Sequence, residues 1–186
     1  MFRASSAVSR SPKASLSGLR KMSATASKVH LDPSHRPVLA VPKLSAASAE
    51  RASKLLQENH DKFHIFFNND GFHNHIAHHL LTIYALGASP EQIQKHYDNN
   101  ASYQRPPVKL EEGVVKDMQD PKVFEEHLGD ENYYRDYLVF FQREIEKKGW
   151  QDVIKEYCLK GDSRGDKMLI RLFAGKSTPT FIAIDG

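Results

Sequence analysis

The sequence predicts an all-α fold, a bundle-like domain of several helices that occupies residues 45–186. Three observations lead to this prediction. Apolar residues recur at spacings of three and four along most of the chain, and short turns rich in Gly, Asn, Asp or Pro separate these runs. Only one stretch, Thr180–Ile184, has a strand-like pattern. Helices joined by short capped turns are typical of an all-α architecture.

The first 44 residues differ from the rest in composition. Residues 1–31 are rich in Ser, Ala and basic side chains and contain no Asp or Glu, and residues 32–45 contain three prolines. This composition is typical of a mitochondrial transit peptide and equally of a disordered tail. We therefore predict that residues 1–44 form a disordered or targeting tail and an extended lead-in.

Composition excludes several classes of protein. The chain has 26 Lys and Arg against 23 Asp and Glu, and six of the basic residues lie in residues 1–31, so the remainder is mildly acidic and predicts no nucleic-acid partner. No apolar run is long enough to span a membrane. A single cysteine, Cys158, excludes an internal disulfide and suits a reducing compartment. We expect a cytoplasmic protein, with a mitochondrial location as the alternative that the N-terminus leaves open, and no particular oligomeric state is predicted.

Two helices are predicted around a strong turn signal. The first runs from Ser45 to about Phe67 and places His60 and His64 on one face. The turn is Asn68–Gly71, and the second helix begins at about His75 and ends at a glycine, Gly87.

Capping signals locate the remaining helices. Ser89, Pro90 and Gln92 form a capping box with proline at the first helical position, which predicts a short helix to about Asp98. Residues 99–113 contain two prolines and are predicted to be a long connection. The later helices are predicted to begin at Asp120, Asp130, Trp150 and Asp166, and to end near Gly129, Gly149, Leu159 and Ala174.

The second helix carries the residues that suggest chemistry. At 100° per residue, His75, His78 and His79 share one narrow wedge with Thr82, while apolar residues fill most of the remaining surface. The helix is therefore predicted to be buried. Burying several imidazoles costs free energy unless each finds a hydrogen bond, an ion or a metal, so this wedge is the first candidate for a functional site.

Two interpretations of the wedge remain open. Histidines at i, i+3 and i+4 can present ring nitrogens to one metal ion, and imidazole suits zinc, iron and copper. The helix contains no carboxylate, so an iron site of two histidines and one carboxylate would need ligands from elsewhere. Alternatively, the histidines form a polar seam by hydrogen bonding to one another and to backbone carbonyl groups.

Four segments resemble the questin oxidase-like family. They are Phe63–Phe67, Gly71–His75, Tyr84–Pro90 and Met168–Gly175, and they occur here in the family's order. The resemblance implies a helical oxidoreductase of fungal secondary metabolism. The implied reaction is an NADPH-dependent, Baeyer–Villiger-type oxygenation, by a monooxygenase-type enzyme, that opens an anthraquinone ring of an aromatic polyketide. Some relatives bind a non-haem iron through histidines.

The resemblance also implies site residues. His75 and its neighbour Asn74 are the best-matched pair, and His73 and His78 fit the motif of fungal members. His79 matches the family less firmly, and with it the predicted metal set is His73, His75, His78 and His79. For acid–base work on a phenolic ring the candidates are His75 first and His64 or His78 second, because a histidine can both take and give a proton near neutral pH. The alternative is a structural histidine held by Asn74.

The C-terminus departs from the family. After Arg171–Gly175 the family continues into a His-Pro segment and a long helical remainder, whereas here Thr178 stands where that histidine is expected. The chain thus resembles the N-terminal part of a larger helical fold, as a shortened member. Two alternatives follow, namely a catalytically inactive helical module and a histidine-rich metal-binding helical protein.

Cofactor and substrate contacts are less marked in the sequence. No Gly-x-Gly-x-x-Gly loop is present, so any NADPH would bind by other contacts, with Arg105, Lys109 and Arg171 as candidates on charge alone. The aromatic residues of the Asp130 helix either pack the core or wall a pocket for a flat substrate. These residues are Tyr133, Tyr134, Tyr137, Phe140 and Phe141.

Overall fold

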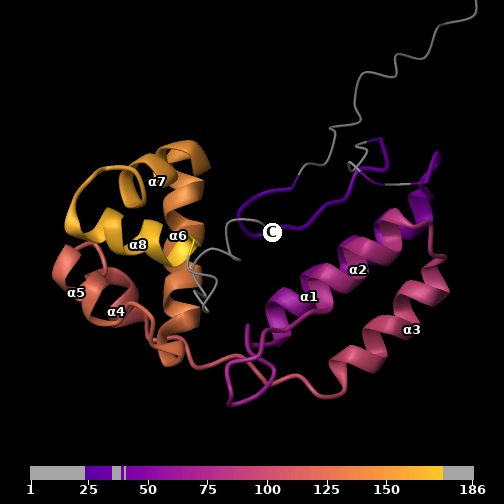
Figure 1. Ribbon diagram of the computed structural model, residues 1–186, viewed down its shortest axis with the longest axis horizontal. Helices are drawn as coiled ribbons and strands as arrows, with labels where there is room; N and C mark the ends of the chain where they lie inside the picture. Colours follow the sequence, from indigo (N-terminus) through magenta and orange to yellow (C-terminus); the bar gives the residue numbers. More distant parts are fainter. Residues whose placement is uncertain (1–23, 35–38, 40, 174–186) are drawn as a thin grey trace, which may run out of the picture.

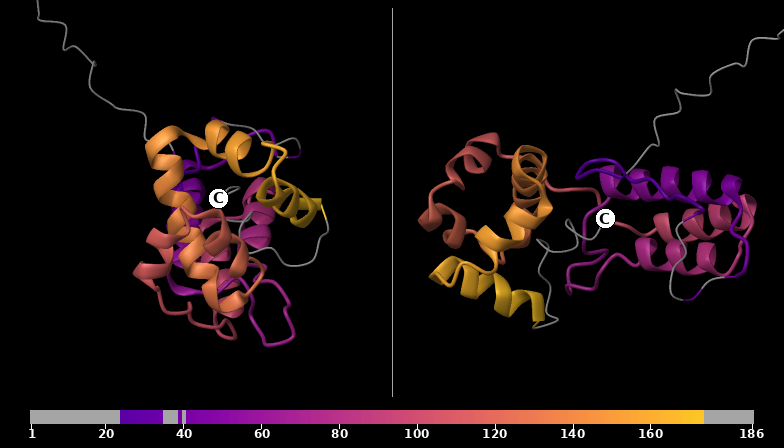
Figure 2. Two further views of the ribbon diagram at one scale, coloured as in Figure 1. Left: turned by 90° about the vertical axis from the view of Figure 1, so that its left-hand side faces the viewer. Right: turned by 90° about the horizontal axis from the view of Figure 1, so that it is seen from above.

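The computed structural model describes residues 24–34, 39 and 41–173, and within them the all-α prediction is confirmed. These residues form eight α-helices and one 3-10 turn, with two isolated β-bridges and no named strand. The helices fall into two groups, which Figure 1 shows as α1–α3 on one side and α4–α8 on the other. The right-hand view of Figure 2, seen from above, shows the same separation.

The first group contains three helices that pack around a core of their own. They are α1 (Ala46–Lys62), α2 (Ile76–Ala85) and α3 (Pro90–Ala101). Each of the three contacts the other two. The buried residues at their centre include Ala52, Leu55, Ile76, Leu80 and Ile93, all 0–2% exposed.

The capping signals of this group are confirmed. The Ser45 hydroxyl accepts from the Ser48 N–H at the start of α1, and Ser89 and Gln92 form the full capping box of α3. Gly87 follows α2 with a φ of +85°, a conformation that a residue with a side chain rarely adopts. These local signals depend on few neighbours, which is why the sequence identifies them correctly.

The second group is built around the aromatic helix. Its elements are α4 (Glu112–Asp117), α5 (Pro121–Glu126), a 3-10 turn (Glu131–Tyr133), α6 (Tyr134–Lys148), α7 (Trp150–Tyr157) and α8 (Ser163–Phe173). Phe124 lies at the centre, where its ring contacts those of Tyr137, Phe140, Phe141 and Tyr157. Cys158 is buried beside this core, and burial raises the pKa of its thiol to about 11.

Three predicted boundaries are wrong, each for a physical reason. Helix α1 ends at Lys62 instead of Phe67, because the backbone of residues 64–66 pairs with other segments and not with the preceding turn. The predicted connection 99–113 runs into α4, a helix with no cap signal of its own. Finally, Asp162 and not Asp166 caps α8, since its carboxylate accepts from the Gly165 N–H at 2.8 Å.

Part of the predicted tail and lead-in packs on α1. The Val29 and Leu31 N–H groups donate to the side chains of Gln57 and Ser53, at 2.9 and 2.8 Å. Ser27 donates to Glu146 on α6 at 3.2 Å, so this segment touches both groups of helices. Residues 1–23 and the strand-like stretch 180–184 lie outside the described residues. Within the part of the chain that is described, none of the helices has the length and apolar character needed to cross a bilayer.

We expect Phe124→Ala to lower the free energy of unfolding by about 3–5 kcal/mol, because it empties the centre of the aromatic cluster. Trp150→Ala, at a side chain that is 54% exposed, is the matched control and should change it by less than about 0.5 kcal/mol. Denaturant unfolding of both variants measures the difference. Equal effects of the two substitutions would contradict this account of the core.

Candidate functional site

Three of the candidate histidines gather at the start of α2. His73 precedes the helix and pairs with Phe66 in an isolated antiparallel bridge, with the two rings stacked at 5.4 Å between centroids. His75 and His78 lie next to each other, with centroids 6.2 Å apart and the rings roughly edge to face. The half-buried His73 therefore stands beside two exposed imidazoles.

The electrostatics of this group favour a neutral His73. Burial lowers the pKa of His73, and the neighbouring imidazoles of His75 and His78 lower it further, because a second positive charge nearby is unfavourable. A neutral imidazole can accept a proton. The arrangement can therefore supply a base close to solvent.

His79 lies apart from the other three. Its ring contacts His96 on α3 at 4.9 Å, and its Nδ1 is 3.0 Å from the Asn100 amide nitrogen. The predicted metal set is thus divided into three residues and one. Among residues 24–34, 39 and 41–173, no group of three or more His, Cys, Asp or Glu is placed to hold a metal ion. The described side chains as placed do not fit a non-haem iron.

The predicted burial of the histidine wedge is wrong. His75, His78 and Thr82 are exposed, and the face that α2 buries against α1 and α3 carries Ile76 and Leu80 instead. The reason is that, among the described helices, α2 packs chiefly on α1 and α3, so its opposite face leaves Leu81 42% exposed, and Leu86 directly after the helix is 69% exposed. The cost of burying imidazoles therefore gives no argument for chemistry at His75 or His78.

His64 is a core residue whose ring nitrogens both have partners. It is 0% exposed, its Nδ1 accepts from the Phe66 N–H at 3.0 Å, and its Nε2 lies 3.4 Å from the Glu131 carbonyl oxygen. Its ring also packs edge-on against Tyr134, with centroids 5.3 Å apart. Burial lowers the pKa of His64, so the neutral form with the proton on Nε2 fits these contacts. These contacts indicate that His64 has a structural role.

Asn74 joins three segments of the chain. Its Nδ2 donates to Asn59 on α1 at 2.7 Å, and its Oδ1 accepts at 2.9 Å from the Ile76 N–H, the first N–H of α2. Its backbone N–H donates to the Ile65 carbonyl. The side chain is buried and holds the loop and the helix together. The sequence suggests that Asn74 holds His75, but the described residues show no hydrogen bond between these two side chains.

Sequence reasoning missed a second place where a histidine has a distinctive environment. His60 on α1 and Gln142 on α6 line a cleft of about 360 Å³ between the two groups of helices. The Gln142 amide lies 2.9 Å from the His60 Nε2. Burial lowers the pKa of His60, and Asp61 offsets this only in part. No sequence signal connects two residues 82 positions apart on different helices.

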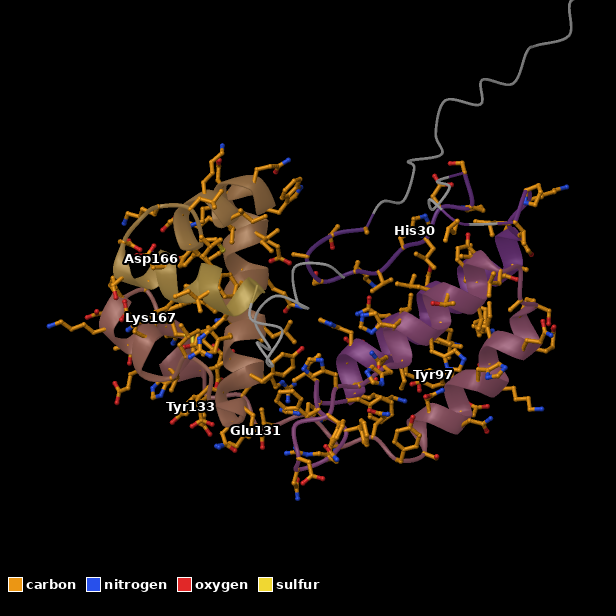
Figure 3. All side chains as sticks on the ribbon, in the orientation of Figure 1. His30, Tyr97, Glu131, Tyr133, Asp166 and Lys167 are labelled. Atoms are coloured by element: carbon orange, nitrogen blue, oxygen red, sulfur yellow. The ribbon has the colours of Figure 1, made fainter. Side chains whose placement is uncertain are left out.

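The remaining polar candidates are engaged in structural contacts. Arg105 donates to the Asn68 carbonyl and to Glu131, which Figure 3 shows at the base of α6, beside the junction. Lys109 pairs with Glu111, and Arg171 donates to the Leu128 carbonyl. These three cations do not converge on one phosphate-sized site.

The aromatic helix mainly packs the core. Tyr137, Phe140 and Phe141 are 1–2% exposed in the second core. Tyr134 is different, because it lies where the two groups of helices meet and also lines the cleft.

Comparison with known proteins finds clear relatives. The profile of the family described as questin oxidase-like matches residues 72–181. The chain is 40% identical over 154 residues to the Baeyer-Villiger monooxygenase dmxR6 of a Cryptosporiopsis species. It is 44% identical over 136 residues to the oxidoreductase AflY of Aspergillus parasiticus, and 35% identical over 156 residues to the questin oxidase of Aspergillus terreus.

These alignments are unequal in what they cover. They include 83%, 73% and 84% of this chain, but only 34%, 28% and 35% of the three relatives. The chain therefore spans about a third of the length of the curated relatives it matches.

We expect Asn74→Ala to lower the free energy of unfolding by about 1–3 kcal/mol, because it leaves buried hydrogen-bonding groups without partners, among them the first N–H of α2. Asn99→Ala, at an exposed position of α3, serves as the control. Thermal or denaturant unfolding gives the comparison. An Asn74→Ala protein as stable as the control would exclude a structural role for this side chain.

We expect the free energy of unfolding to fall as the pH drops below about 6.5. Burial lowers the pKa values of His60, His64 and His73 in the folded state, so the unfolded chain binds more protons and gains stability as the pH falls. Denaturant unfolding between pH 8 and pH 5.5 measures this slope. His64→Gln, which retains one donor and one acceptor, should flatten it, and an unchanged slope would remove His64 from the explanation.

Proposed function

The chain belongs to the questin oxidase-like family, and on that premise we propose that it is an oxidoreductase for a Baeyer–Villiger-type oxygenation of a polycyclic aromatic polyketide. One observation carries the proposal, namely the 40% identity to a Baeyer-Villiger monooxygenase over 83% of this chain. Because only about a third of that relative is matched, the activity of a whole relative enters here as part of the proposal.

The proposed reaction inserts one atom of O₂ between a ring carbonyl carbon and its neighbouring carbon. The carbon–carbon bond breaks, two new carbon–oxygen bonds form, and the product is a lactone. The other oxygen atom leaves as water, formed with a hydride from NADPH, which carries two electrons and one proton, and a second proton from solvent. An anthraquinone with a free phenol is a suitable substrate because loss of the phenolic proton makes the ring electron-rich.

The histidines at the start of α2 are proposed to move that phenolic proton. His75 and His78 are accessible, and a neutral His73 stands beside them. Asn74 is a positioning residue here, since it fixes the first turn of α2 and so the place of His75. His64 is removed from the proton-transferring set because both of its ring nitrogens face protein groups.

The described residues give no support for placing either cofactor that the family resemblance implies. No group of three ligands is placed for iron, and the candidate cations for NADPH already have protein partners. We derive no step through iron. NADPH enters the proposal only as the source of two electrons.

The second candidate function is that of a helical module without catalysis. The observation that favours it is the open face of α2, where His75 and His78 are exposed together with Leu81 and Leu86. A histidine-rich metal-binding protein is a variant of the same idea. Elemental analysis of the purified chain and of His75→Ala tests this metal-binding hypothesis. A metal ion bound by the wild-type chain should be lost from the His75→Ala protein.

The oxygenation proposal predicts NADPH-dependent oxygen uptake with an anthraquinone such as questin. His75→Ala should lower kcat by about 100-fold or more, the usual effect of losing a positioned acid–base group. His30→Ala, at a histidine of the segment packed along α1 and outside the proposed proton-transferring set, should retain full activity (Figure 3). Product formation by mass spectrometry and oxygen uptake give the two readouts. No turnover, with or without added iron, would count against the proposal and favour the inactive module.

A further inference from the structure

The cleft between the two groups of helices has apolar walls from both sides. Phe63 and Pro107 line it together with Tyr134, Leu138 and Val139 of α6, and its volume is about 360 Å³. Pockets that bind small molecules fall in the range of roughly 300–1,000 Å³ and are lined mainly by apolar and aromatic residues with a few polar groups. Two other hollows, both of which include Arg51, are bordered mainly by charged side chains, and a third, lined by Ile83 and Leu86, lies at the end of α2.

The hydrogen-bonded pair of His60 and Gln142 leaves one donor and one acceptor for a ligand. As placed, Gln142 donates its amide N–H to the Nε2 of His60, which puts the imidazole proton on Nδ1. Among the described residues, no further hydrogen bond occupies the Gln142 amide oxygen or the His60 Nδ1. Burial favours the neutral imidazole by lowering the pKa of His60.

Tyr134 adds a third group with unused capacity. The residue is 8% exposed, and within residues 24–34, 39 and 41–173 its hydroxyl has no hydrogen-bond partner. Burial raises the pKa of Tyr134 to about 12, so the hydroxyl keeps its proton and can donate it to a ligand oxygen.

The charge of the lining points to a neutral ligand. The cleft contains one cation and one anion, Arg135 and Asp61. Each also has a protein partner, since Arg135 donates to the Val108 carbonyl and Asp61 accepts from Gln57. A phosphate or carboxylate would find no concentration of positive charge here.

We propose that the cleft between α1 and α6 binds a flat, neutral aromatic compound that carries both a phenolic hydroxyl and a ring carbonyl, with His60, Gln142 and Tyr134 hydrogen bonding to its oxygens. The hydroxyl donates to the Gln142 amide oxygen, and the carbonyl accepts from His60 or Tyr134. The choice of ring system rests on the proposed function.

Titration of the full chain with 1,8-dihydroxyanthraquinone tests this assignment. We expect saturable one-to-one binding by calorimetry, with amide chemical-shift changes centred on residues 60–63 and 134–142. Anthraquinone without hydroxyl groups should bind about five-fold more weakly, the effect of one lost hydrogen bond. Neither NADPH nor oxygen is added, so this result is independent of turnover.

Two variants in the cleft and two controls locate the ligand. Val139→Trp, which fills the cleft, should raise Kd at least about ten-fold, and Gln142→Leu about five-fold. Gln94→Leu, at a half-buried glutamine of α3, and Asn99→Ala, at an exposed position of the same helix, should leave Kd unchanged. Circular dichroism and thermal melting check that each protein is folded. If Val139→Trp does not fold, the test rests on Gln142→Leu.

Three results would overturn the inference. They are no binding, wild-type affinity in a folded cleft variant, or loss of affinity in His75→Ala with shifts at the start of α2. Binding without turnover would leave the cleft assigned and refute the oxygenation. Turnover that the cleft variants do not alter would support the oxygenation and refute the cleft as the binding site.

Discussion

The structure depends on how residues 63–67 satisfy their backbone groups after α1 ends. The His64 N–H donates to the Arg105 carbonyl, the Ile65 carbonyl accepts from Asn74, and the Phe67 N–H donates to the Phe72 carbonyl. A buried backbone group without a partner costs as much as a lost hydrogen bond, so these pairings fix where three separate segments meet. The start of α2, the base of α6 and the ring of His64 all take their positions from this crossing.

The same crossing explains why the two histidine environments differ. On one side, His73 stacks on Phe66, and the chain continues into α2, whose histidines face outward. On the other side, His64 packs against Tyr134, which lines the cleft together with His60. Two surfaces with imidazoles thus lie on either side of one packed set of rings. His60 in the cleft is more enclosed by protein than His75 and His78 are. The segment Gly71–His75, which matches the family motif, lies on the open side.

The sequence predicts the helices where a local signal decides, and fails where distant segments decide. Ser89 and Gln92 cap α3 through neighbours three residues apart, so the pattern alone suffices. The end of α1 depends on a hydrogen bond to Arg105, 41 positions away from His64, and helical periodicity cannot reveal it. The candidate site follows the same rule, because helical spacing correctly groups His75 with His78 but cannot say which face of α2 meets solvent.

The lone thiol of the chain has a practical consequence for studying it. Cys158 is buried beside the aromatic core, and its raised pKa keeps it as the unreactive thiol near neutral pH. A cysteine introduced on the surface of α1 or α6 can therefore be alkylated selectively while the native one stays in place. Two fluorescent dyes attached to introduced cysteines, one on α1 and one on α6, would report the distance between the two groups of helices in solution. Cys158 would not have to be removed first.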